Sequence, residues 1–186
     1  MYIVKTPDLP DNCKVITQPK TDMKFRELTF QDWQQVKDIY EEGIASGNAT
    51  FQTSAPAWEE WDSSHVKNSR IIALDEADNI LGWAALSPVS GRCVYAGVGE
   101  VSVYVSQNAQ GKGVGKALLN ELIRQSEQNG FWTLTAGIFP ENKASLKIHE
   151  QAGFKILGIR ESIGKMNGHW RDTVLLERRS QTVGMD

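Results

Sequence analysis

The sequence is poor in cysteine, with only Cys13 and Cys93, and neither has a CxxC partner. This excludes a disulfide framework and is typical of a protein in a reducing cytoplasm. Long apolar runs are missing too: no stretch approaches the roughly 20 apolar residues that a membrane-spanning helix needs. The N-terminus also lacks the charged start and apolar run of a signal peptide. We therefore expect a soluble, cytoplasmic protein that has no membrane partner.

An excess of positive charge is also missing, since the net charge is -3 over 186 residues. No broad basic field is available to bind nucleic acid phosphates or an anionic membrane. His65 and His169 have no metal-ligand spacing with each other or with the cysteines, so no metal is expected. What is present is ordinary globular composition, 40% hydrophobic and 23% charged. The length suits one domain with a sizeable core.

The order of periodic segments predicts an α/β fold, with a mixed central sheet and flanking helices. Residues 1–21 hold three prolines and little periodicity, which indicates an N-terminal extension. The domain is predicted at 22–180 and a C-terminal tail at 181–186. Strands are predicted at 23–28, 70–74, 80–86, within 95–105, and at 132–138, 154–163 and 169–177, the last two as a hairpin. Helices are predicted at 30–45, shortly after residue 56, at 114–128 and at 142–151.

A glycine-rich segment, QGKGVGK at 110–116, lies between a predicted strand and a predicted helix. Free backbone N–H groups and the positive end of the helix dipole attract phosphate oxygens at such a place. Glycines let the backbone come close, and the two lysines add charge suited to a pyrophosphate. The spacing fits neither a Walker loop nor the GxGxxG pattern, whose last glycine is Lys116 here. The segment predicts an anion-binding loop; the alternative is a flexible glycine-rich connection.

Several motifs in order resemble the GNAT acetyltransferases, and more closely the phosphinothricin and methionine sulfoximine N-acetyltransferase family. They span about Met23 to Arg179 and read YEEGIASGNATFQT, GWAALSPVSGRCVYAGVGEVSVYV, QGKGVGKALL, TLTAGIFPENKASLKIHEQAGF and GKMNGHWRDTVLLER. The resemblance implies a single-domain GNAT fold whose central sheet is splayed at the acetyl-CoA site. It also implies an enzyme that transfers the acetyl group of acetyl-CoA to the amino group of a small amino acid analogue, such as phosphinothricin, methionine sulfoximine or methionine sulfone.

The same resemblance implies the contacts of acetyl-CoA. The backbone of Val103, Tyr104 and Val105 would pair with the pantetheine arm as an added strand. Asn142 would bond to the end of that arm. The pyrophosphate would lie against the glycine-rich loop, at Gly111, Lys112, Gly113, Val114, Gly115 and Lys116.

Acetyl transfer needs a neutral amine and a route by which its proton leaves. By the resemblance, Glu100 is the base that removes this proton, directly or through water; without it, Glu100 is a surface glutamate at a strand end. His149 matches a histidine near the reacting centre of the family. It could protonate the departing thiolate, relay the amine proton or orient the substrate. Many GNAT enzymes have a tyrosine acid at this position, so the acid role stays open.

Three further residues, Phe51, Arg92 and Tyr95, match family positions that line the acceptor site. Arg92 could bind the substrate carboxylate through its guanidinium fork, and the alternative is a solvated loop arginine. Phe51 would bound the pocket or belong to the core. Tyr104 shares a strand face with Glu100 at a distance of roughly 13 Å, which suits a wall or a hydrogen-bond role.

The resemblance also implies a homodimer in which the C-terminal hairpin helps to build the neighbouring site. Two other functions stay open. One is a GNAT enzyme for another amine, such as a polyamine, an aminoglycoside or a peptide N-terminus; the other is a non-catalytic acyl-CoA-binding module. A larger or more basic acceptor would favour an acidic groove, whereas Arg92 beside Glu100 suits a small zwitterion.

Overall fold

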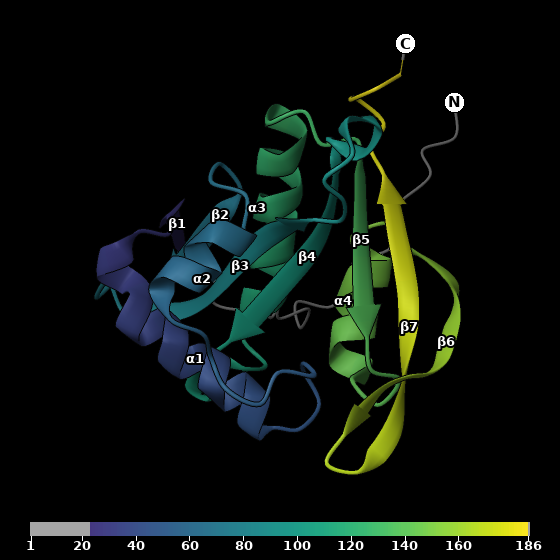
Figure 1. The fold of residues 1–186 in the computed structure, drawn as a ribbon. Helices are drawn as coiled ribbons and strands as arrows, with labels where there is room; N and C mark the ends of the chain where they lie inside the picture. Colours follow the sequence, from purple (N-terminus) through teal and green to yellow (C-terminus); the bar gives the residue numbers. More distant parts are fainter. Residues whose placement is uncertain (1–22, 186) are drawn as a thin grey trace, which may run out of the picture.

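Seven strands form one mixed sheet in the computed structural model, which describes residues 23–185 (Figure 1). The strands are β1 (Lys24–Glu27), β2 (Arg70–Leu74), β3 (Ile80–Pro88), β4 (Val98–Val105), β5 (Thr133–Ile138), β6 (Lys155–Met166) and β7 (His169–Arg179). Their order across the sheet is β1-β2-β3-β4-β5-β7-β6. Within this sheet β4 and β5 are parallel, and the other neighbours are antiparallel. The predicted mixed α/β fold is confirmed, and the predicted N-terminal extension lies outside the described residues.

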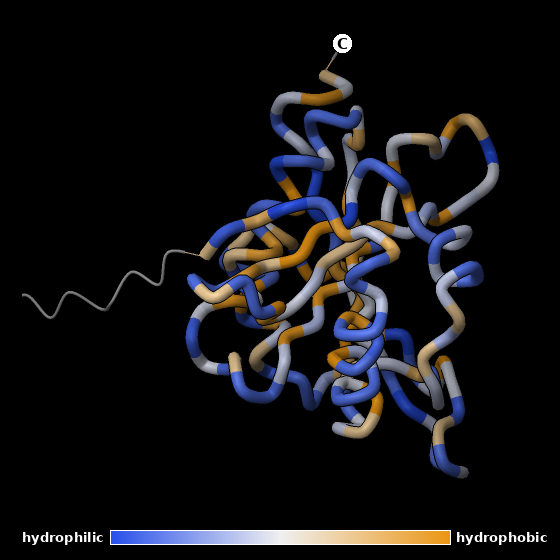
Figure 2. The backbone as a smooth tube through the Cα atoms, turned by 90° about the vertical axis from the view of Figure 1, so that its left-hand side faces the viewer, coloured by the Kyte–Doolittle hydropathy of each residue, from blue (hydrophilic) through white to orange (hydrophobic). Residues whose placement is uncertain are grey.

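Helices cover both faces of the sheet. Helices α1 (Trp33–Ala45) and α2 (Trp58–Ser64) lie on one face, and α3 (Val114–Gln128) and α4 (Lys143–Gln151) lie on the other (Figure 1). A hydrophobic core forms on each side, and Figure 2 shows the hydrophobic segments of the backbone running through the centre of the molecule. None of the helices described here combines the length and the apolar character needed to cross a membrane.

Helix α3 follows the sequence pattern closely. Its buried residues include the predicted stripe, which consists of Val114, Leu118, Leu119, Leu122 and Ile123. The helix ends before Gly130, whose φ of 83° lies in the left-handed region that favours glycine after a helix. Because the stripe is packed against the sheet, the N-terminal turn of α3 is held beside the C-terminal end of β4.

Some predicted boundaries differ from the structure for local reasons. The predicted helix at 30–45 starts with a 3-10 turn at Phe30–Asp32. A second 3-10 turn at Cys93–Tyr95 precedes β4, so this strand begins only at Val98. Strand β6 continues past its predicted end because its pairing with β7 resumes after a bulge between Arg160 and Gly164. Within the bulge Ser162 has a φ of 49°, and its N–H donates to the carboxylate of Asp172 at 2.7 Å.

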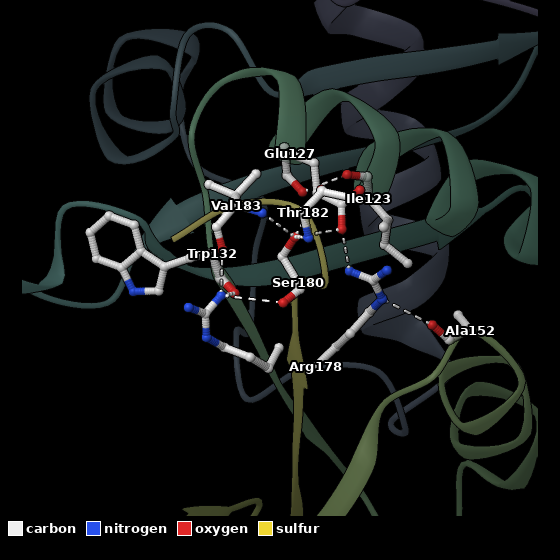
Figure 3. Close-up of polar contacts among 10 residues, drawn as sticks. Ile123, Glu127, Trp132, Ala152, Arg178, Ser180, Thr182 and Val183 are labelled. Carbon is white, nitrogen blue, oxygen red and sulfur yellow. Dashed lines mark hydrogen bonds and ion pairs between the residues drawn. The ribbon is translucent and has the colours of Figure 1, made fainter. Parts of the chain in front are cut away.

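A polar network joins the C-terminal end of β7 to both helices on that face (Figure 3). Arg178 donates to Oε1 of Glu127 at 2.9 Å and to the carbonyl oxygen of Ala152 at 3.2 Å. Ser180 donates to the same carboxylate oxygen at 3.0 Å. The tail after β7 is held by Arg179, which donates to the carbonyl oxygen of Val183 at 2.7 Å. This end of the sheet is therefore closed by side-chain contacts.

Candidate active site

At the other end of the sheet, a gap opens between β4 and β5. The two strands pair only over Val98–Glu100 and Thr133–Thr135, and then they diverge (Figure 1). The opposite edge of β4 pairs with β3 over Gly99–Val105. The backbone groups of Val101–Val105 that face β5 therefore have no strand partner within residues 23–185. A free strand edge of this kind can pair with an extended ligand.

A groove of about 810 Å³ runs from this edge to the glycine-rich loop. Nine of the predicted cofactor residues line it: Val103, Tyr104, Val105, Gly111, Gly113, Val114, Gly115, Lys116 and Asn142. Lys112 is not among the lining residues and instead donates to the carbonyl oxygen of Asn108 at 2.8 Å. Lys147 also lines the groove and was not predicted. The groove thus joins a free strand edge to a cationic loop.

Two of the loop glycines adopt a backbone conformation that favours glycine. Gly111 and Gly113 have φ values of 74° and 83°, which L side chains rarely adopt. A β-carbon at Gly115 would lie 3.4 Å from the side chains of Ile148 and Val105, which is an ordinary van der Waals contact, so packing does not require glycine at this position. The first N–H groups of a helix have no intrahelical partner and favour an anion. The N-terminal turn of α3 offers such groups to the groove.

A smaller cavity of about 170 Å³ adjoins the groove. It brings together the two predicted catalytic residues, Glu100 and His149, and it also takes in Tyr104. The other polar lining residues are Thr50, Ser102, Asn142 and Ser145. Because Tyr104 and Asn142 line both spaces, the small cavity lies at one end of the groove.

Glu100 stands where β4 and β5 separate. It is the third residue of β4 and lies opposite Thr135 of β5 and Ser87 of β3. A β-carbon added at Gly137 would lie 3.6 Å from Oε1 of Glu100, so the carboxylate leans toward β5. The residue is exposed, and an exposed carboxylate has free lone pairs that can accept a proton.

His149 is a buried histidine of α4, with 3% of its surface exposed. Its Nδ1 lies 2.8 Å from the carbonyl oxygen of Ser145, which can only accept, so Nδ1 carries the hydrogen. Burial lowers the pKa of His149, and the hydrogen bond to Ser145 offsets this only in part. The imidazole is therefore neutral near pH 7, with its free lone pair on Nε2.

Tyr104 forms the aromatic wall shared by both cavities. Its ring stacks on Trp83 with centroids 4.6 Å apart and meets the ring of Tyr40 edge-on at 4.7 Å. Burial raises the pKa of Tyr104, the neighbouring Tyr40 adds to the rise, and a hydrogen bond with Thr50 opposes it. The phenol therefore keeps its proton at neutral pH and can donate a hydrogen bond.

Asn142 connects α4 with the segment that follows α1. Its Oδ1 accepts from the N–H of Ser145 at 3.1 Å and caps the helix. Its Nδ2 donates to the carbonyl oxygen of Asn48 at 3.1 Å. Both ends of the amide are thus engaged within the protein, and one N–H remains for a ligand.

The three predicted acceptor residues are not among the lining residues of either cavity. Arg92 lies in the exposed loop before β4, with its Cζ 5.8 Å from the centre of the Tyr95 ring. The ring of Phe51 packs on Phe139 with centroids 4.8 Å apart. Arg92 and Tyr95 are therefore close to each other, but neither joins Glu100 in the small cavity.

Several residues that line the small cavity were not predicted from the sequence. Ser102 lies two residues after Glu100 and shares its face of β4, so the strand period could have revealed it. Ser145 lies one helical turn before His149, and the helical period could have revealed it. Thr50 follows a turn-rich stretch and carries no local signal of its own.

The family model described as an acetyltransferase (GNAT) domain matches residues 25–175. The chain belongs to the GNAT acetyltransferase family. It is an acetyl-CoA-dependent N-acetyltransferase. The Bacillus subtilis protein YwnH, whose name marks it as a candidate phosphinothricin acetyltransferase, is 36% identical to it over 84% of this chain and 98% of YwnH.

Two further relatives of this acetyltransferase are similar over most of their length. An L-methionine sulfoximine/L-methionine sulfone acetyltransferase of Salmonella typhimurium is 30% identical over 83% of this chain and 93% of its own. The crystal structure of a phosphinothricin acetyltransferase from Sinorhizobium meliloti, in complex with acetyl-CoA, aligns with a TM-score of 0.77 and 30% identity. That alignment covers 88% of this chain and 96% of the other.

The residues present in this acetyltransferase fit acetyl-CoA. The free edge of β4 offers backbone groups to the amides of a pantetheine arm. The N-terminal turn of α3 and Lys116 suit a pyrophosphate. The groove that joins them ends at the cavity with Glu100 and His149, where the thioester would have to lie for acetyl transfer.

Proposed function

We propose that this acetyltransferase acts on the amino group of a small amino-acid-like acceptor of the phosphinothricin, methionine sulfoximine or methionine sulfone type. The observation that carries the proposal is the cavity of about 170 Å³ that combines Glu100 with His149. Pockets for drug-sized ligands measure roughly 300–1,000 Å³, so this one suits a smaller molecule. The names of the Bacillus and Salmonella relatives support the same class of acceptor.

Glu100 is the proposed base of the reaction. Acetyl-CoA supplies the acetyl group as a thioester, which a neutral amine can attack. Glu100 accepts the proton of the acceptor amine, directly or through one water molecule. Its exposed position at the parting of β4 and β5 supports this role. Those N–H groups of Val101–Val105 that face the gap toward β5 are the donors available to polarise the thioester carbonyl.

His149 is proposed as a proton relay or a substrate-orienting group. Its Nδ1 hydrogen is engaged by Ser145, and its lowered pKa leaves Nε2 as an acceptor. A neutral imidazole in this tautomer cannot protonate a thiolate until it has first taken up a proton. Tyr104 keeps its own proton and is the alternative donor toward the sulfur. The balance favours His149 as an acceptor in such a proton relay, and not as the acid that protonates the thiolate.

Release of coenzyme A, followed with a thiol reagent, tests the acceptor. The panel contains methionine sulfoximine, phosphinothricin, ordinary amino acids, a polyamine, an aminoglycoside and a short peptide. Turnover confined to the first two compounds is the expected result. Turnover with the polyamine, the aminoglycoside or the peptide alone would replace the proposal by another GNAT activity. Acetyl-CoA binding with no turnover across the panel would reject this acceptor class and point to an acceptor outside the panel.

A cytoplasmic homodimer is part of the same proposal. Strand β6 forms one edge of the sheet (Figure 1), and its exposed apolar side chains include Leu157 at 56% and Ile159 at 59%. Trp170 of β7 is 63% exposed nearby in the same hairpin. An edge strand with apolar side chains is a template for pairing with a second copy. The cytoplasm is where acetyl-CoA is available to such an enzyme.

A further inference from the structure

Arg171, near the start of β7, makes an unusual set of contacts with the segment after α1. Its Nη1 donates to the carbonyl oxygen of Gly47 at 3.1 Å, and its Nη2 donates to Oδ1 of Asn48 at 3.3 Å. The same Nη2 donates to Glu141 at 3.1 Å. The Cζ of Arg171 also lies 4.1 Å from the centre of the Phe139 ring. One guanidinium thus bridges a strand, a loop and an aromatic ring.

The segment that Arg171 holds is a wall of both cavities. Asn48 lines the groove, Thr50 lines the small cavity, and Ala49 between them lines both. The carbonyl oxygen of Asn48 accepts from Asn142, which also caps α4. Arg171 and Asn142 therefore hold the same loop from two sides, and Asn142 extends this support to the helix that carries His149.

Arginine suits this place for physical reasons. A planar guanidinium can donate to several acceptors in one plane while its face lies on an aromatic ring, and a lysine ammonium cannot. The carboxylate of Glu141 is 62% exposed, so this ion pair is worth little by itself. The contacts that matter are those to Gly47 and Asn48, because they are made to the loop that borders the substrates.

We infer that Arg171 is a positioning residue, which fixes the Gly47–Thr50 segment as the common wall of the groove and the small cavity. The inference rests on the proposed function in one respect, since it takes these cavities to hold acetyl-CoA and the acceptor. Arg171 itself lines neither cavity, so its effect on the substrates is exerted through Asn48 and its neighbours.

Arg178 provides a matched control in the same strand. Its side chain is 20% exposed, compared with 19% for Arg171, and it also pairs with one carboxylate and one backbone carbonyl. Its network lies at the closed end of the sheet (Figure 3), and it lines neither cavity. Loss of either arginine removes comparable contacts, but only one of the two networks reaches the cavities.

The test compares Arg171→Lys and Arg171→Ala with the same changes at Arg178. We expect Arg171→Lys to raise the acetyl-CoA Kd, measured by titration calorimetry, and the acceptor KM by roughly tenfold each. The Arg178 variants should lower the melting temperature to a similar extent while both constants stay within about twofold. Glu141→Gln should also stay within about twofold, because its ion pair is exposed. If Arg171→Ala does not fold, the two constants measured for Arg171→Lys are sufficient to test the inference.

The inference is overturned if both constants of Arg171→Lys stay within about twofold of the wild type, or if Arg178→Lys shifts them equally. Calorimetry with acetyl-CoA needs no acceptor, so it separates this inference from the proposed function. A silent acceptor panel together with weakened acetyl-CoA binding by Arg171→Lys would reject the acceptor class alone. Normal turnover of methionine sulfoximine by Arg171→Lys, with unchanged acetyl-CoA binding, would reject the role of Arg171 alone.

Discussion

Gly43 and Tyr104 are in close contact: a β-carbon added at Gly43 would lie 2.7 Å from Cδ1 of Tyr104. Glycine inside a helix costs about 1 kcal/mol relative to alanine. Its presence in α1 is explained by the ring on which the helix packs. That ring is also stacked on Trp83, so it has little freedom to move away. The position of α1 is thereby coupled to the aromatic wall of both cavities.

Replacing Gly43 by alanine should therefore displace Tyr104 or α1. We expect a loss of about 1–3 kcal/mol in the free energy of unfolding, since overpacking outweighs the gain in helix propensity. The acetyl-CoA Kd should rise, because Tyr104 lines the groove. Thermal unfolding and calorimetry measure the two effects. Gly158→Ala, at a position with open space around it, is the control, and a Gly43→Ala protein more stable than the wild type would contradict the argument.

Arg92→Ala tests whether this exposed arginine binds the acceptor carboxylate. A lost charged contact should raise the acceptor KM by about tenfold. The acetyl-CoA Kd should stay unchanged, because Arg92 is not among the residues that line the groove. Steady-state kinetics with methionine sulfoximine provide the measurement, and Arg124→Ala, which removes an exposed arginine of α3, is the control. An unchanged KM would place the carboxylate site elsewhere.

His149 should make the protein less stable as the pH falls. Its usual pKa of 6.5 is lowered in the folded chain by burial, so below that value the unfolded chain binds more protons than the folded one. The contribution of His149 to the free energy of unfolding is fully present above the pKa of the unfolded chain. It is lost as the pH falls toward the lower pKa of the folded chain. Each unit of lowering corresponds to about 1.4 kcal/mol.

His149→Gln should therefore flatten the decrease in stability between about pH 7 and pH 5. Part of the decrease should remain, because burial also lowers the pKa of His65. Chemical denaturation at a series of pH values measures the slope. His169→Gln, at the exposed first residue of β7, is the control for the loss of a histidine side chain. Equal slopes for the wild type and His149→Gln would mean that His149 does not titrate differently on unfolding.

The predicted homodimer depends on the apolar side chains of β6. Light scattering at micromolar concentration should give about twice the chain mass of 20.7 kDa for the wild type. Ile159→Asp should shift the mass to that of one chain, because it places a charge in the apolar edge. Phe30→Asp, which changes a residue 60% exposed in the 3-10 turn before α1, should remain dimeric. A wild-type protein of single-chain mass would reject the dimer.

Local patterns in the sequence were sufficient for the elements but not for the contacts across the site. The strand period placed Glu100 and Tyr104 on one face of β4, and the helical period found the stripe of α3. The loop glycines predict an anion-binding loop, which stays a prediction, and the left-handed φ of Gly113 explains one of these glycines locally. The length over which β4 and β5 pair depends on two strands far apart in the chain, so no local pattern contains it.

The contacts that hold the walls of the cavities could not be predicted from local patterns for the same reason. Arg171 and Gly47 are 124 residues apart, and Asn142 and Asn48 are 94 residues apart, so their contacts exist only after folding. The protonation state and tautomer of His149 could not be predicted from the sequence either, because they depend on the burial of the ring and on its contact with the Ser145 carbonyl. Its three possible roles could be narrowed only once the tautomer was defined by geometry.

Glu100→Gln is the decisive change for the proposed mechanism. Glutamine has nearly the same shape but cannot accept the amine proton, so kcat should fall by roughly 10² or more. The acetyl-CoA Kd should stay within about twofold, because Glu100 is not a lining residue of the groove. Stability should change by less than about 0.5 kcal/mol at this exposed position. Single-turnover kinetics separate the chemical step from binding.

Glu177→Gln provides the control on the same rung of the sheet. Glu100 and Glu177 lie on either side of Thr135, and the two variants carry the same chemical change. Glu177 lines neither cavity, so its kcat should stay within about twofold of the wild type. A near-normal kcat for Glu100→Gln would reject Glu100 as the base. An equal loss in both variants would point to the charge of this sheet region instead of a proton transfer at Glu100.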